Sequence, residues 1–299
     1  MLAVSVAPAN STNPSAASVP FVRTRTFDPE PGMLMQLWDE EIEDCYVEIV
    51  LIDWASILEI ECFVAPSTEY VPRWKGPTNP LVLFIGDSIT CGMALEQSDG
   101  GQPMPRGTLD AFPTQALSIL RDKYSYHLSL DIVAYPGISL VSLAHQDDDA
   151  APTASGMIDK FFHMTPWDPT AWTPRGDPKF ICIALGTNDE ANDVEPQTFR
   201  STLERFIRML STTFSSVEAF YIIAPFRDFN DPDLGAIHND LVSKPFVVDD
   251  LDIHLCDINS RMKAEHTVDG LHPTLAGHTI LGEHLAQFLV GQAPAPTAN

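Results

Sequence analysis

The stretch LVLFIGDSIT, residues 81–90, decides how the central part of this sequence is interpreted. Five apolar residues, 81–85, are followed at once by Gly86, Asp87 and Ser88. A short, continuous apolar run that ends at a glycine predicts a strand of a parallel sheet, buried on both faces. A serine directly after such a strand belongs either to an ordinary turn or to a functional site. The rest of the chain distinguishes these alternatives.

Four similar apolar runs follow along the chain, separated by segments with a helical pattern. The expected strands are 81–85, 130–134, 180–185, 219–224 and 251–256, and the expected helices are 112–124, 154–163, 197–214 and 274–290. This alternation is typical of βαβ units. It predicts an α/β fold, namely a three-layer α/β/α sandwich around a mainly parallel five-stranded sheet. Internal repeats are absent from the sequence, which excludes solenoids and propellers.

The N-terminal part of the chain has a different composition. Residues 1–25 are rich in Ala, Ser, Pro, Asn and Thr, which predicts a disordered tail. The segments CYVEIVLID (45–53) and ILEIECFVA (57–65) mix β-branched, aromatic and acidic residues, which predicts antiparallel strands. We therefore expect a tail at 1–25, a small β-rich segment and linker at 26–79, the main domain at 80–291 and a flexible C-terminus at 292–299.

Charge and hydropathy exclude several classes of partner. The sequence has 17 Lys and Arg against 41 Asp and Glu, a formal net charge of −24, which repels phosphate backbones and anionic membrane surfaces. Nucleic acid and membrane partners are therefore not expected. The N-terminal MLAVSVAPANS lacks a basic region and has only a short apolar run, which favours a cytoplasmic location over secretion, the alternative.

Cysteine and histidine spacing indicates no metal or redox site. The five cysteines lack paired CxxC spacing, although Cys45 and Cys62 flank one β segment and could pair in an oxidising compartment; the alternative is buried thiols. Four histidines recur every six residues, a step that does not keep them on one helix face. They are His266, His272, His278 and His284. We expect no metal and no cofactor.

Polar blocks follow three of the expected strands and precede the last helix. They are GDS (86–88), YPG (135–137), GTND (186–189) and DGLHP (269–273). In open parallel sheets, ligands bind at the carboxyl ends of the strands, so we expect these blocks to meet at one edge of the sheet. Each block alone is a common turn or cap. Their joint occurrence in this order favours a functional site.

Together these blocks contain the groups that nucleophilic catalysis requires. A serine hydroxyl attacks when a base takes its proton and a third group orients that base. In this sequence Ser88 is the candidate nucleophile, His272 the candidate base and Asp269 the orienting carboxylate. The oxyanion needs positioned donors, for which the candidates are the backbone N–H groups of Ser88 and Gly137 and the side-chain amide of Asn188.

The sequence also resembles a known family. FIGDSIT, YPGISL, LGTND and DGLHP closely resemble the four signature blocks of the SGNH hydrolases, the GDSL-like esterase and lipase superfamily, over about 81–290. The resemblance implies the flavodoxin-like fold of that superfamily and catalysis without a cofactor. It also implies five functional residues: Ser88 as nucleophile, His272 as general base and acid, Asp269 as its carboxylate, and Gly137 and Asn188 as oxyanion donors together with the Ser88 amide.

Within the superfamily, FIGDSITCG after a β-rich segment looks most like the carbohydrate esterases that remove acetyl groups from sugars. The expected function is a serine esterase acting on short-chain carboxylic esters, with O-acetyl groups on carbohydrates among its substrates. A lipase or thioesterase acting on longer acyl chains is the first alternative. A non-catalytic binding module that has kept the fold is the second.

Several other segments keep two interpretations. The Gly- and Pro-containing loop 93–112 is either a substrate lid or a surface loop. Trp167 and Trp172 either form an aromatic platform for a sugar ring or pack in the interior. We expect Asp189 to support hydrogen bonds of a loop, and Cys91 to pack against its surroundings rather than react.

Overall fold

The computed structural model describes residues 2–8, 23–27, 36, 45–52, 79–93, 104, 106–143, 155–173, 176–231 and 235–292. Its centre is a five-stranded sheet with the strand order β5-β4-β6-β7-β8, in which every neighbouring pair is parallel. The strands are β4 (Leu81–Gly86), β5 (Ser129–Ala134), β6 (Phe180–Ala184), β7 (Ala219–Ile223) and β8 (Ile253–Cys256). The prediction of five parallel strands is confirmed.

The order of the strands in the sheet reverses beside β4. Of the strands in this sheet, β4 comes first along the chain and lies between β5 and β6, so the chain reverses its direction of winding beside β4. Gly86 at the end of β4 pairs with Ala134 of β5 and with Ala184 of β6, so the carboxyl ends of these three strands are level. This switch in winding is where doubly wound folds bind their ligands.

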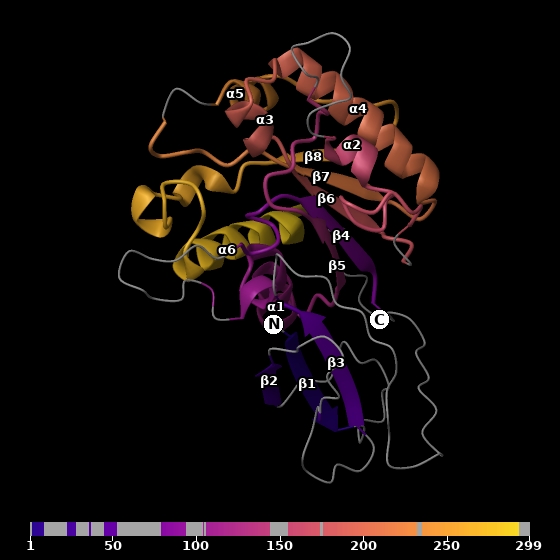
Figure 1. Cartoon of the computed structure of the whole chain (residues 1–299), viewed down its shortest axis with the longest axis vertical. Helices are drawn as coiled ribbons and strands as arrows, with labels where there is room; N and C mark the ends of the chain where they lie inside the picture. The colour runs from indigo at the N-terminus through magenta and orange to yellow at the C-terminus, as the bar shows by residue number, and fades with distance from the viewer. Residues whose placement is uncertain are drawn as a thin grey trace.

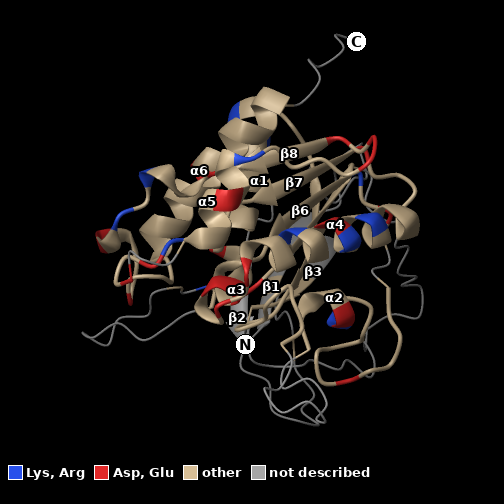
Figure 2. Cartoon of the chain, turned by 90° about the horizontal axis from the view of Figure 1, so that it is seen from above, with Lys and Arg blue, Asp and Glu red and all other residues tan. Residues whose placement is uncertain are grey.

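Helices cover both faces of the sheet (Figure 1). On one face lie α1 (Phe112–Tyr124) and α6 (Leu275–Gln292), which contact each other. On the other lie α2 (Met157–Lys160), α4 (Pro196–Thr213) and α5 (Ala236–Ser243). Figure 2 shows the same layers from above, with acidic residues in several of the surrounding loops and helices. The predicted three-layer α/β/α sandwich is confirmed.

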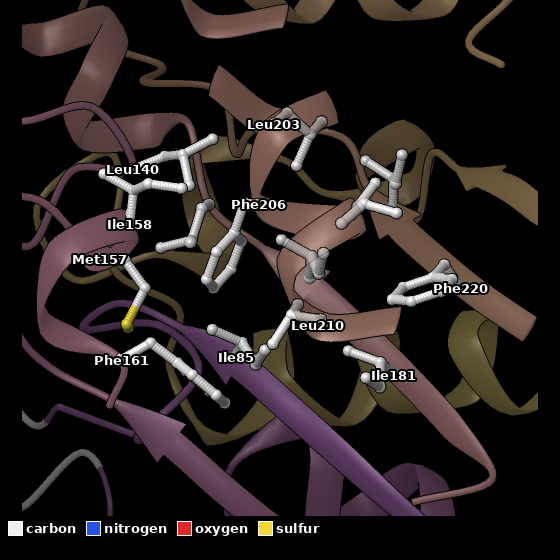
Figure 3. Close-up of a cluster of buried hydrophobic side chains, with 14 of the residues drawn as sticks. Ile85, Leu140, Met157, Ile158, Phe161, Ile181, Leu203, Phe206, Leu210 and Phe220 are labelled. Atoms are coloured by element: carbon white, nitrogen blue, oxygen red, sulfur yellow. The ribbon is translucent and has the colours of Figure 1, made fainter. Parts of the chain in front are cut away.

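The core has two parts, one on each side of the sheet. Side chains of β4 alternate between them: Val82 and Phe84 face α1 and α6, whereas Leu83 and Ile85 face α4. Buried residues of α4 spaced three and four apart pack onto the second face beside Phe161 and Met157, as Figure 3 shows. They are Phe199, Leu203, Phe206, Ile207 and Leu210. Alternation along the strands therefore fixes which helices cover each face.

The N-terminal strands form a separate antiparallel sheet with the order β2-β1-β3. They are β1 (Leu2–Pro8), β2 (Arg23–Phe27) and β3 (Cys45–Leu51). The prediction of a disordered tail over 1–25 is wrong for residues 2–8, because LAVSVAP pairs along its length with β3 and buries Val4. It is also wrong for residues 23–25, which belong to β2 and pair with β1. The antiparallel strand expected at 45–53 is confirmed, and the one expected at 57–65 lies outside the described residues.

The expected helix at 154–163 is much shorter than predicted, because only Met157–Lys160 is helical. Gly156 is extended and packs against the backbone of Leu140, and the N–H of Met157 donates to the Ser139 carbonyl at 2.8 Å. The helix therefore begins only after these contacts. Two short helices were not predicted, α3 (Thr187–Ala191) and α5. In the described part of the chain, no helix has the length and apolar content needed to cross a membrane.

Candidate active site

Ser88 lies in the turn that follows β4, at the edge of the sheet. Gly86 makes this turn possible, since a Cβ there would lie 2.0 Å from the Oγ1 atom of Thr90, which is fully buried. The N–H of Met93 donates to the Ser88 carbonyl at 2.9 Å, and the Cys91 thiol contacts the same oxygen at 3.3 Å. These contacts fix the backbone of Ser88.

A chain of two hydrogen bonds connects Ser88 to a histidine and a carboxylate. The Ser88 Oγ lies 3.0 Å from His272 Nε2, and His272 Nδ1 lies 2.8 Å from Asp269 Oδ2. Burial alone would raise the pKa of Asp269, but hydrogen bonds from the side chain and backbone of His272 outweigh it and lower that pKa. Asp269 is therefore ionised at neutral pH and can stabilise a protonated His272. The structure brings together these three sequence-predicted residues.

Hydrogen bonds within the loop hold the turn that carries Asp269 and His272. Asp269 Oδ1 accepts hydrogen bonds from the N–H groups of Leu271, at 3.0 Å, and His272, at 2.7 Å. The N–H of Val268 donates to the His272 carbonyl at 2.8 Å. Because the carboxylate binds the backbone of the loop as well as the imidazole, the position of the histidine ring is set by its own turn.

Contacts from the loop after β7 hold the turn from outside. The Asn230 side-chain amide donates to the Asp269 carbonyl, and the N–H of Phe229 donates to the Gly270 carbonyl at 2.9 Å. Gly270 has φ +94° and lies so close to Asn230 that a Cβ would be 2.1 Å from its amide nitrogen. A glycine is therefore required here for both its backbone conformation and its size.

The predicted oxyanion donors lie on three neighbouring segments. Within the described part of the chain, the backbone N–H groups of Ser88 and Gly137 have no hydrogen-bond acceptor. Gly137 is exposed with φ +75°, and a Cβ there would meet nothing within 4 Å. Asn188 Nδ2 donates to the Ile138 carbonyl at 3.1 Å and lies 3.4 Å from Asp87 Oδ2. Two free backbone donors thus exist, while the Asn188 amide is turned toward the protein.

Two buried carboxyl groups lie behind these donors. Burial raises the pKa of Asp87 to about 7, against the lowering effect of the Ile89 N–H, and the charge of Asp189 raises it further. Burial also raises the pKa of Asp189 to about 6, although the N–H groups of Val141 and Leu140 lower it. The prediction that Asp189 supports loop hydrogen bonds is confirmed. No sequence pattern had indicated a role for Asp87 beyond its place in the GDS block, or for Asn230.

The other residues singled out in the sequence do not belong to the chain from Ser88 through His272 to Asp269, or lie outside the described residues. Burial raises the pKa of the Cys91 thiol to about 12, so it is not a thiolate nucleophile. Trp172 packs against the core, whereas the side chain of Trp167 is 74% exposed. The side chains of Cys45 and Cys62, and most of the loop 93–112, lie outside the described residues.

The four evenly spaced histidines have separate surroundings. His278 is fully buried, and its Nδ1 accepts the N–H of Phe112 at the start of α1, at 3.1 Å. Burial lowers its pKa to about 3, so it is neutral. His284 Nδ1 lies 3.1 Å from the Ile258 carbonyl, and His266 Nδ1 accepts the N–H of Lys263. Among the described residues, no group of three His, Cys, Asp or Glu side chains is arranged to hold a metal ion.

The sequence matches no family model and no curated protein, but solved structures match the fold. A family two carbohydrate esterase from Clostridium thermocellum aligns with a TM-score of 0.53 at 19% identity, over 73% of this chain and 66% of that chain. An active site mutant of a family two carbohydrate esterase from the same organism aligns with a TM-score of 0.51 at 19% identity, over 71% of this chain and 64% of that chain. A family two carbohydrate esterase from Cellvibrio japonicus aligns with a TM-score of 0.49 at 18% identity, over 72% of this chain and 62% of that chain.

The two Clostridium thermocellum structures, each with a TM-score above 0.5, show that this chain shares its fold with family two carbohydrate esterases. It spans less than two thirds of the length of the two Clostridium thermocellum chains.

Proposed function

We propose that this protein is a serine hydrolase that cleaves carboxylic esters through a covalent acyl-enzyme. The observation that carries the proposal is the chain from Ser88 Oγ through His272 to Asp269, with distances of 3.0 and 2.8 Å, at the carboxyl edge of the sheet. A hydroxyl, an imidazole and a carboxylate in this order are what general-base activation of a serine requires. The backbone N–H groups of Ser88 and Gly137, which have no acceptor within the described residues, are the proposed donors for a developing oxyanion.

In the first half of the proposed reaction, His272 Nε2 takes the Ser88 proton as Oγ attacks the ester carbonyl carbon. The carbonyl oxygen becomes negatively charged and accepts hydrogen bonds from the N–H groups of Ser88 and Gly137. Asp269 stabilises the imidazolium through Nδ1. His272 then gives the proton to the ester oxygen of the leaving alcohol, the C–O bond breaks, and the acyl group stays on Ser88.

In the second half, water replaces the alcohol. His272 takes a proton from the water as its oxygen attacks the acyl carbon, and a second tetrahedral oxyanion forms against the same donors. His272 returns the proton to Ser88 Oγ when the acid leaves. Every step uses groups of this chain and water, so the proposal includes no cofactor.

We assign Asn188 as the third oxyanion donor. Its Nδ2 makes one hydrogen bond of 3.1 Å, to the Ile138 carbonyl, and one long contact of 3.4 Å, to Asp87 Oδ2. The long contact is the weaker of the two. In the proposed reaction, the Asn188 amide gives up its long contact with Asp87 and donates to the substrate oxyanion instead, after a small rotation of the side chain. Its hydrogen bond to the Ile138 carbonyl is kept.

For the substrate, we propose short-chain esters, with O-acetyl groups on carbohydrates as the favoured class. The support is the fold similarity to family two carbohydrate esterases, one of which was solved in complex with cellohexaose. Measured rates with p-nitrophenyl esters of increasing acyl length test the acyl preference. A fall beyond butyrate supports the proposal, whereas a rise toward long chains supports a lipase or thioesterase. Acetate release from acetylated oligosaccharides tests the alcohol side.

A fluorophosphonate probe tests the nucleophile. Wild type should be labelled at one site and should hydrolyse p-nitrophenyl acetate, whereas Ser88→Ala should lose both properties. Ser211→Ala is a matched control, because the Ser211 hydroxyl donates to the carbonyl of Arg208 in its own helix, α4. It should behave as wild type. A wild-type protein that is not labelled, or a Ser88→Ala variant that keeps full turnover, would contradict the proposed function.

A further inference from the structure

Two consecutive residues of α3 bind the segment that follows Gly137. The Asn188 side chain donates to the Ile138 carbonyl at 3.1 Å. Asp189 Oδ2 accepts the N–H of Leu140 at 2.8 Å, and its Oδ1 accepts the N–H of Val141 at 2.9 Å. Three hydrogen bonds therefore run from the start of α3 to the four residues 138–141.

The Asp189 carboxylate is well suited to this contact. Its side chain is 0% exposed, so water does not compete for its oxygens. Each oxygen accepts one backbone N–H at 2.8 or 2.9 Å, a length typical of hydrogen bonds to an ionised acceptor. Its pKa, raised by burial to about 6, still leaves it mainly ionised at neutral pH. A buried carboxylate with two N–H donors fixes the backbone in two places.

The backbone N–H groups of residues 138–141 make few other hydrogen bonds within the described residues. The N–H of Ile138 donates to the Tyr135 carbonyl at 3.3 Å, across the turn that contains Gly137. The carbonyls of Ser139 and Leu140 accept N–H groups from the start of α2. The N–H groups of Leu140 and Val141 donate to the Asp189 carboxylate. Asp189 is thus the side chain that accepts the N–H groups of Leu140 and Val141, while Asn188 binds the Ile138 carbonyl.

We infer that Asp189 is a positioning residue, whose buried carboxylate holds residues 138–141 and thereby aims the Gly137 N–H at the oxyanion formed on Ser88. This inference rests on the proposed function. Asp189 itself does not touch the substrate. Its effect passes through the backbone from Val141 and Leu140 to Gly137, while Asn188 fixes the intervening Ile138 carbonyl.

The test is Asp189→Asn, which keeps the size of the side chain and one oxygen acceptor but turns the other oxygen into an amide that cannot accept an N–H. We expect kcat to fall about tenfold to hundredfold with KM nearly unchanged. A misaligned oxyanion donor loses part of the transition-state stabilisation that is lost when the donor is removed. Active-site titration with the fluorophosphonate probe corrects kcat for any unfolded fraction.

Glu190→Gln is the matched control. Glu190 is the next residue of α3 and is also buried, and its Oε1 also accepts a backbone N–H, that of His238 at 2.7 Å. That N–H belongs to the first turn of α5, not to the segment 138–141. A purely structural role for Asp189 predicts that both variants lower thermal stability and that neither lowers kcat per titrated site. The inference predicts that only Asp189→Asn lowers kcat.

A second variant covers the case in which Asp189→Asn does not fold. Val141→Pro removes the N–H that donates to Asp189 Oδ1 and leaves the carboxylate in place. It should lower kcat and leave KM nearly unchanged. The inference is overturned if the variant that folds, Asp189→Asn or Val141→Pro, keeps a kcat per titrated site within about twofold of wild type. It is also overturned if Glu190→Gln lowers kcat per titrated site as much as that variant does. Failure of wild-type labelling would instead overturn the proposed function.

Discussion

Replacing Asp87 with asparagine should make the stability of the protein less dependent on pH. Asp87 is 1% exposed, and its Oδ1 accepts the N–H of Ile89 at 3.0 Å. Asparagine has nearly the same size and keeps an oxygen at that position. The substitution therefore removes the ionisable group from the turn after β4 while preserving this backbone contact.

The magnitude follows from the pKa of the buried carboxyl. Its ordinary value is 3.8, and burial raises the pKa of Asp87 in the folded chain to about 7. Between these values the folded chain holds a proton that the unfolded chain has lost, so the free energy of unfolding falls as pH rises through this window. At about 1.36 kcal/mol per pKa unit, the full loss is about 4 kcal/mol above pH 7. The charge of the nearby Asp189 adds to the rise in the pKa of Asp87.

The assay is urea unfolding of wild type and Asp87→Asn between about pH 5 and about pH 8. The variant should gain stability relative to wild type as pH rises, by about 3 kcal/mol between about pH 5 and about pH 8, because part of the full loss already occurs below pH 5. Asp159→Asn, at an exposed position of α2, is the control and should follow wild type. A difference between wild type and Asp87→Asn that stays constant over this range would refute the assignment of a raised pKa to Asp87.

Two further variants test the supports of the site. Asn230→Ala removes the hydrogen bond to the Asp269 carbonyl. It should lower kcat about two- to tenfold, which corresponds to the free energy of one net hydrogen bond, and leave KM unchanged. An unaltered kcat would show that the turn does not need this hydrogen bond. Gly86→Ala places a Cβ 2.0 Å from the Oγ1 of the buried Thr90 and should lower the free energy of unfolding by about 1–3 kcal/mol, measured by urea unfolding. Thr90→Gly in the same chain should restore part of that loss, and no recovery would locate the strain elsewhere.

Strands and long helices were predictable because they carry a local pattern. The apolar run before Gly86 and the three- and four-residue spacing of buried side chains in α4 are visible in the sequence itself. The helix α3 was missed because TNDEA has no apolar stripe, and α5 because eight residues give too short a periodicity. The strand β1 was missed because its pairing with β3 depends on a partner about forty positions away.

The same distinction applies to the site. Ser88, Asp269 and His272 were predictable because each belongs to a short block whose chemistry is specific, and the geometry brings them within hydrogen-bond distance. The support from Asn230 was not predictable, because its contact with the Asp269 carbonyl spans 39 positions and no local pattern indicates it. Residues that act on other residues are found only when the chain is folded.

The separation of Ser88 from its base has a consequence for biosynthesis. The two residues are 184 positions apart in the chain, and β6, β7, β8 and most of the helices lie between them. At about 5–20 residues per second, a ribosome adds His272 about 10 to 40 s after Ser88. Throughout that interval the hydroxyl has no partner to take its proton. If the proposed mechanism holds, a nascent chain does not hydrolyse esters, and activity begins only when the C-terminal helix docks and completes the fold.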